Sequence, residues 1–145
     1  MGLKGQIISV EVTYLIHATE DEGKVEAAVS RLLGGTRAPA KESLEGHFGN
    51  KILKVKFQLT GDDATSALRR LLAEMPGDLK KEIASKIESF VDEHLAFYLR
   101  LDKQRLVSGE VAMALGEPVR LKVKLRKFNM EGGARDFYVH LLEGA

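Results

Sequence analysis

The sequence contains no cysteine and no long apolar run. Without cysteine, the chain can form no disulfide, no thiolate metal site and no cysteine nucleophile. A membrane-spanning helix needs roughly 20 consecutive apolar residues, and the amino-terminal stretch MGLKGQ leads directly into a strand pattern without a signal-peptide core. We therefore expect a cytoplasmic protein with no membrane partner.

Net charge is also nearly absent, since 22 basic residues face 21 acidic ones. Hydrophobic residues make up 44% and charged residues 30% of the chain, which is typical of a folded globular protein. A length of 145 residues fits one domain, and we expect residues 1–145 to form a single unit.

Positive charge is concentrated in two segments, 51–58 and 118–128, which together hold eight basic residues and no acidic ones. In the second segment (PVRLKVKLRKF) apolar and basic residues alternate, and residues 53–59 repeat the pattern. Successive side chains of a strand point to opposite faces, so two such strands in one sheet would place their cations on one surface. That surface would suit a polyanion. The alternative is a solvated sheet face whose lysines guard an exposed edge.

Two further strands are predicted from the same alternation, near residues 8–16 and 97–101. Residues 110–115 lead through a Gly-Glu-Pro turn into the basic strand, which predicts an antiparallel hairpin. Residues 36–50 show no regular pattern and are expected to form a long loop.

Helices are predicted between these strands. Thr19 and Glu22 have the spacing of a capping box, and Gly34–Gly35 would end the helix that follows. Apolar residues at helical spacing predict two grouped helices across residues 61–91 and a short one near the carboxyl terminus. This order favours an α+β two-layer sandwich, with a largely antiparallel sheet, helices packed on one face and a basic open face.

Three polar clusters, at residues 17–21, 45–50 and 100–104, lie where predicted strands begin or end. Each has a structural interpretation of its own. The first could start a helix, the second could be a glycine turn, and the third could be an ion pair closing a strand.

The motifs IHATED at 16–21, EGHFGN at 45–50 and LRLDKQ at 99–104 resemble those of one archaeal group, the small RNA-binding family described as predicted exosome subunits. The resemblance extends over nearly the whole chain. It implies RNA binding and a fold like that of the large-subunit ribosomal protein that binds 5S rRNA. It also implies an accessory role in an exosome-type or ribosomal complex, with exosome or ribosomal proteins as further partners. The residues it singles out are His17, Thr19, Asp21, Gly46, His47, Gly49, Asn50, Arg100, Asp102, Lys103 and Gln104.

The chemistry of the side chains divides these residues into hydrogen-bond donors and carboxylates. Side chains that donate hydrogen bonds suit phosphates and base edges, whereas Asp21 and Asp102 would repel phosphate and are expected to cap helices or form ion pairs. Phe48 is expected to plug the core and anchor its loop, with stacking on an unpaired base as the alternative. The predicted RNA-contact residues are Lys54, Lys56, Arg100, Lys103, Arg120, Lys122, Lys124, Arg126, His47 and Asn50.

We expect no cofactor, no metal and no catalytic residue. Tyr98 is the only aromatic residue expected to point outward in mid-strand, and the aromatic-rich signature of an RRM is missing. Two alternative functions stay open. One is a protein-binding adaptor whose basic face meets an acidic partner. The other is a small nuclease in which His17, His47, Asp21 and Asp102 converge on a metal.

Overall fold

The computed structural model describes residues 6–35, 38–126 and 133–144. Its elements, in chain order, are β1 (Ile7–His17), α1 (Glu22–Leu32), β2 (Ala40–Glu45), β3 (Lys51–Thr60), α2 (Gly61–Glu74), α3 (Gly77–Ser85), a short 3-10 helix η1 (Ile87–Ser89), β4 (Phe97–Asp102), α4 (Lys103–Val107), β5 (Pro118–Leu125) and α5 (Gly133–Gly144).

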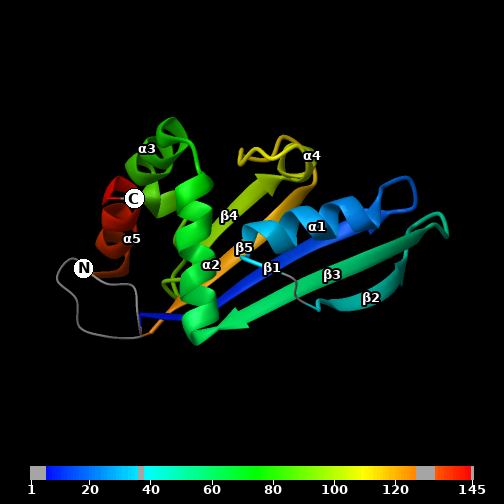
Figure 1. Cartoon of the computed structure of the whole chain (residues 1–145), viewed down its shortest axis with the longest axis horizontal. Coiled ribbons are helices and arrows are strands. Elements are labelled where there is room, and N and C mark those ends of the chain that lie inside the picture. Colours follow the sequence, from blue (N-terminus) through cyan, green and yellow to red (C-terminus); the bar gives the residue numbers. More distant parts are fainter. Residues whose placement is uncertain (1–5, 36–37, 127–132, 145) are drawn as a thin grey trace.

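The strands of the described residues form one five-stranded antiparallel sheet in the order β2-β3-β1-β5-β4. Helices α1 and α2 lie across one face of this sheet, and α3 and α5 pack together beside it (Figure 1). Within the described ranges the other face carries no helix, and we call it the open face. The predicted α+β two-layer sandwich is therefore confirmed.

The core lies between the sheet and the helices because the alternating strands direct their apolar side chains to that side. Val12 and Tyr14 of β1, Phe57 of β3 and Leu121 of β5 are almost completely buried there. They meet the apolar stripe of α2, which includes Leu68. Each such side chain contributes about 1.5–3 kcal/mol through burial, so the strand alternation determines which sheet face remains exposed.

The amino terminus of α1 differs from the predicted capping box. Strand β1 continues to His17, and a tight turn follows in which the Glu20 N–H donates to the His17 carbonyl at 2.9 Å. Thr19 lies within that turn, and Asp21 caps the helix by accepting from the Lys24 N–H at 3.1 Å. The helix ends at Leu32 and is followed, as predicted, by Gly34, whose φ of +95° suits glycine.

The prediction of a loop over residues 36–50 is wrong, because residues 40–45 form β2. Every residue of β2 is exposed, so its sequence carries no apolar alternation that could have revealed it. The strand is held by its pairing with β3 and by Lys41, whose Nζ lies 2.6 Å from Glu22 and 2.8 Å from Glu26 of α1.

The predicted hairpin between residues 110–115 and the basic strand is also wrong. After α4 the chain reverses direction. Residues 112–114 then lie antiparallel to β4, along the edge of β4 that faces away from β5. The Asp102 N–H donates to the Ala112 carbonyl at 2.8 Å, and the Ala114 N–H donates to the Arg100 carbonyl at 2.9 Å. This segment covers an edge that would otherwise offer unpaired backbone groups.

The remaining elements agree with the predicted patterns, with two changes. The helix expected across residues 79–91 ends at Ser85, although Ile87 and Phe90 still pack against the core. The basic strand ends at Leu125, and residues 127–128 of the predicted strand lie outside the described residues. Among the described residues, no helix has both the length and the apolarity required to cross a membrane.

Candidate nucleic-acid interface

Cations from three strands line up across the open face. In one row Lys56 of β3, Thr13 of β1, Arg120 of β5 and Arg100 of β4 are direct neighbours in the register. A second row contains, in the same strand order, Gln58, Glu11, Lys122 and Tyr98. The two basic strands therefore share one face, as predicted, with β1 between them.

Arg100 and Arg120 form the most informative pair of this face. They lie directly opposite each other on β4 and β5, and both are exposed. Neither has an ion-pair partner among the described residues, whereas the nearby Lys56 lies 3.2 Å from Glu11. Like charges directly opposite each other destabilise a sheet. The two guanidinium groups of this uncompensated pair offer hydrogen-bond donors and positive charge that suit an anion.

A hollow of about 520 Å³ lies in the open face beside this pair. We call it the central hollow. Its charged lining consists of Lys54, Arg100, Arg120 and Lys122, with Glu11 as the single acid. The Glu11 carboxylate is already engaged by Lys56, so the hollow keeps a positive excess. Its charge suits phosphate groups.

Lys122 is fixed in the second row by its neighbour Tyr98. The ammonium lies 5.5 Å from the centre of the Tyr98 ring, at the distance of a cation–π contact. A hydrogen bond with the Tyr98 hydroxyl is the main cause that raises the pKa of Lys122 above its ordinary value. Lys122 therefore stays charged at any physiological pH.

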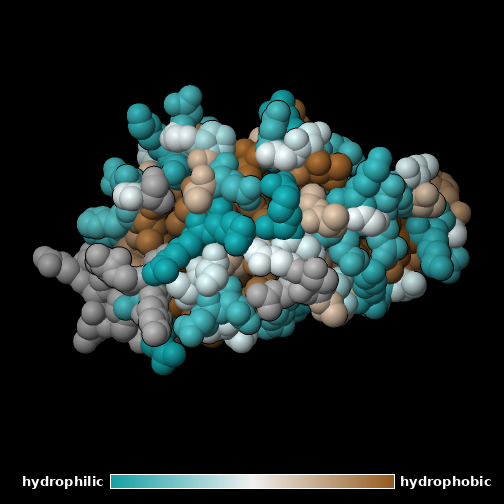
Figure 2. Space-filling model, in the orientation of Figure 1, coloured by the Kyte–Doolittle hydropathy of each residue, from teal (hydrophilic) through white to brown (hydrophobic). Residues whose placement is uncertain are grey.

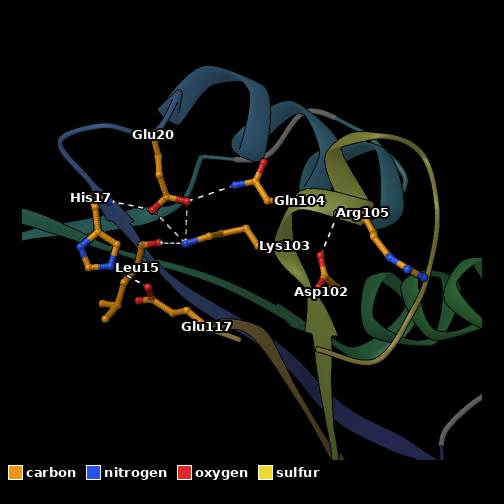
Figure 3. A network of polar contacts seen from close by, with 8 residues as sticks. All are labelled: Leu15, His17, Glu20, Asp102, Lys103, Gln104, Arg105 and Glu117. Atoms are coloured by element: carbon orange, nitrogen blue, oxygen red, sulfur yellow. Dashed lines mark hydrogen bonds and ion pairs between the residues drawn. The ribbon is translucent and has the colours of Figure 1, made fainter. Parts of the chain in front are cut away.

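Lys103 requires a correction, because it is not available to RNA. Its side chain is almost fully buried, at 4% exposure. Figure 3 shows the Nζ between the Leu15 carbonyl, at 2.7 Å, and the Glu20 carboxylate, at 3.0 Å. Gln104 also donates to Glu20, at 3.3 Å. This network joins the first and third sequence motifs and holds α4 against the end of β1.

The Glu20 carboxylate is partly buried, which disfavours its charged form, yet the hydrogen bonds from the His17 N–H and Lys103 outweigh burial and lower its pKa below the ordinary value of 4.5. A carboxylate with a lowered pKa stabilises the fold above that ordinary value, and the contribution disappears as the pH falls through the folded-state pKa.

We therefore expect Glu20→Gln to be less stable than the parent protein at neutral pH, with a difference that shrinks steadily below about pH 4.5. Thermal unfolding of the two proteins across pH 3–7 measures this difference. A gap that stays constant over the whole range would show that Glu20 contributes no charge-dependent stability.

His47 and Asn50 lie in the turn between β2 and β3 and not on the open face. The Asn50 carbonyl accepts from the Gly46 N–H, and Gly49 adopts a φ of +78°. The His47 ring meets Phe48 edge-on, with ring centres 4.9 Å apart. Phe48 is 91% exposed, so its predicted role as a core plug is wrong.

The other predicted residues are placed as follows. Asp21 and Asp102 cap α1 and α4, as expected from their charge. Lys54 and Lys124 are exposed on the open face. Arg126 follows β5 and is exposed, and its backbone N–H donates to the Gln6 carbonyl at 2.8 Å.

The four residues considered as metal ligands do not converge. Asp21 and Asp102 cap different helices, and His47 lies in the β2–β3 turn. In the described part of the chain, the candidate ligand cluster is His17, Glu20 and Glu117, with His17 Nε2 only 2.6 Å from Glu117. The Lys103 ammonium already neutralises Glu20 there, so ion pairing accounts for this group.

An antiparallel sheet with helices on one side and cations across the other defines an α+β domain suited to binding polyanions. A family model described as RNA binding matches residues 9–125. The chain is 33% identical over 141 residues to RNA-binding protein PAB1135 of Pyrococcus abyssi, and the alignment covers 90% of each. The chain therefore belongs to this RNA-binding family.

Solved structures of archaeal proteins share the fold. Protein AF2318 from Archaeoglobus fulgidus is 30% identical, with a TM-score of 0.78 over 93% of this chain and 99% of that one. Mth689 from Methanothermobacter thermautotrophicus is 26% identical, with a TM-score of 0.71 over 96% of this chain and 97% of that one. The sheet and its helix layer are thus common to these proteins.

Proposed function

We propose that this protein binds RNA without catalysing a reaction on it, through phosphate contacts on the open face. The observation that carries this proposal is the uncompensated Arg100–Arg120 pair beside the central hollow. The proposed contact residues are Lys54, Lys56, Arg100, Arg120, Lys122, Lys124 and Arg126.

Membership of an RNA-binding family supports RNA as the polyanion. The arrangement of the cations supports it as well. Residues two apart on one strand, such as Arg120 and Lys122, lie roughly 7 Å apart along the strand, which is close to the spacing of successive phosphates in an extended nucleic-acid strand. The hairpin residues His47 and Asn50 can add contacts beyond the sheet, since both are exposed.

We further propose that the protein is a cytoplasmic accessory factor of an exosome-type or ribosomal complex. An accessory factor needs a surface for protein in addition to one for RNA. Such a surface is available at the upper edge of the view in Figure 2, where a groove of about 660 Å³ opens between α3 and residues 109–115. Acidic side chains, among them Asp78 and Glu110, and apolar side chains such as Leu79 line this groove, so it would repel RNA.

Fluorescence anisotropy of labelled RNA, titrated with the protein at low and moderate salt, tests the proposal. We expect binding that weakens steeply as salt is added, because phosphate contacts release counterions. Absence of binding at low salt would contradict RNA binding and favour the adaptor alternative. In that case an acidic protein partner should stay bound to the open face in the presence of excess RNA.

A further inference from the structure

A second hollow of about 320 Å³ adjoins the central hollow on the open face, and Tyr98 lines both. We call it the side hollow. Its polar lining consists of Tyr98, Asp92, His94, Lys122 and Lys124. The volume lies at the lower end of the range of small-molecule sites, which are roughly 300–1,000 Å³. Tyr98 thus stands between a site rich in cations and one of mixed character.

The two hollows differ in what they can accept. The central hollow has a positive excess and suits phosphate. The side hollow contains the carboxylate of Asp92, whose pKa is held below its ordinary value chiefly by the hydrogen bond from the Ala96 N–H. An ionised carboxylate accepts hydrogen bonds from the N–H groups of a base, which a phosphate diester cannot donate. Lys122 and Lys124 also line the side hollow, so it is the carboxylate together with the Tyr98 ring that favours a base there.

The walls of the side hollow are held in place before any ligand binds. The Asp92 Oδ1 accepts from the backbone N–H groups of His94 and Ala96, both at 2.9 Å. The Tyr98 N–H donates to the Phe90 carbonyl at 2.8 Å, and the Lys122 ammonium lies against its ring. Tyr98 is nevertheless 38% exposed, which is unusual for a large ring in mid-strand on this sheet. A fixed and exposed aromatic ring is a stacking platform for a base.

We propose that the side hollow binds one unpaired RNA base, stacked on Tyr98, while its neighbouring phosphates lie in the central hollow. This inference rests on the proposed RNA binding and adds that the ligand is single-stranded RNA or an unpaired segment of a folded RNA. Bases in a duplex are stacked on each other and cannot enter the side hollow.

The absence of tryptophan from the chain makes the test specific. Tyr98→Trp introduces a single indole at the proposed site, and Leu115→Trp introduces one at an exposed position of the groove beside α3 as a matched control. Titration with a single-stranded uridine oligomer should quench the fluorescence of Tyr98→Trp and leave that of Leu115→Trp unchanged. An RNA duplex of equal charge should quench neither variant.

Affinity provides a second readout. Tyr98→Leu keeps an apolar side chain without the ring and should weaken binding of the oligomer about 5- to 150-fold, with duplex binding unchanged. Tyr98→Phe should bind like the parent protein. Quenching in Leu115→Trp alone, or full affinity in Tyr98→Leu, would overturn the proposal while RNA binding itself stands. If the parent protein binds no RNA, both the proposed function and this site fail together.

Discussion

Arg120→Glu is expected to weaken RNA binding by about 25-fold or more at 0.1 M salt. Each phosphate contact contributes roughly 0.7 powers of ten to the affinity for a single strand at this salt concentration. The substitution removes two contacts at once, because the new carboxylate faces Arg100 across the β4–β5 pair and engages its charge. Anisotropy titrations of the variant and the parent protein with the same RNA measure the change.

The same substitution should leave the fold intact or make it more stable. When a like-charge pair at directly opposed strand positions is replaced by an opposite-charge pair, the folded state is stabilised by roughly 0.2–1 kcal/mol. We therefore expect an unfolding midpoint equal to or higher than that of the parent protein. A variant that is more stable and yet binds RNA poorly would show that the arginine pair is present for binding and not for folding.

The matched control is Arg69→Glu, which changes the net charge by the same amount on the helix layer. Arg69 is an exposed residue of α2. The Arg69→Glu substitution should lower RNA affinity only slightly, through the change in net charge. Equal losses in the two variants would mean that net charge alone matters and that the open face is not the binding surface.

Lys103→Met is expected to destabilise the protein by about 3 kcal/mol, because removing one partner of a buried ion pair leaves the other charge uncompensated. The Glu20 carboxylate and the Leu15 carbonyl would both lose the donor that now lies within 3.0 Å of them. Chemical denaturation measures the free energy of unfolding. Affinity for RNA should be unchanged as long as the protein is folded.

Lys54→Met is expected to have the opposite effects to Lys103→Met, weakening RNA binding and leaving stability nearly unchanged. Lys54 is exposed in the central hollow and has no ion-pair partner among the described residues. Its replacement should leave stability within about 0.5 kcal/mol and weaken RNA binding by the equivalent of one phosphate contact. A stable Lys103→Met protein that has lost RNA affinity would restore Lys103 to the binding surface and contradict its structural role.

These two lysines illustrate what the sequence can predict about the site. The alternation of Lys54 and Lys122 with apolar neighbours placed both on the open face correctly, because a half-buried strand obeys a period of two. For Lys103 the sequence offers only the family resemblance and a side chain that donates hydrogen bonds, and both point to RNA. Its partner Glu20 lies 83 positions earlier in the chain, so only the packing of α4 against the end of β1 brings them together.

For the fold as well, the sequence predicts the elements that bury one face and misses those held by backbone pairing. Strands β1, β3 and β5 bury one face and therefore carry an apolar alternation that the sequence displays. Strand β2 buries no side chain, so its sequence pattern predicts a loop. The side-chain pattern of residues 112–114 does not reveal their pairing with β4, because that pairing rests on backbone hydrogen bonds. The adjacency of Tyr98 and Lys122 likewise depends on the β4–β5 register.

The slope of the logarithm of RNA affinity against the logarithm of salt concentration tests the central claim most directly. For single-stranded RNA this slope is roughly −0.7 per phosphate engaged. The parent protein should give a steep negative slope, and Arg120→Glu should give a slope shallower by about 1.4, the equivalent of two phosphates. Identical slopes in the two proteins would contradict the assignment of RNA phosphates to the open face.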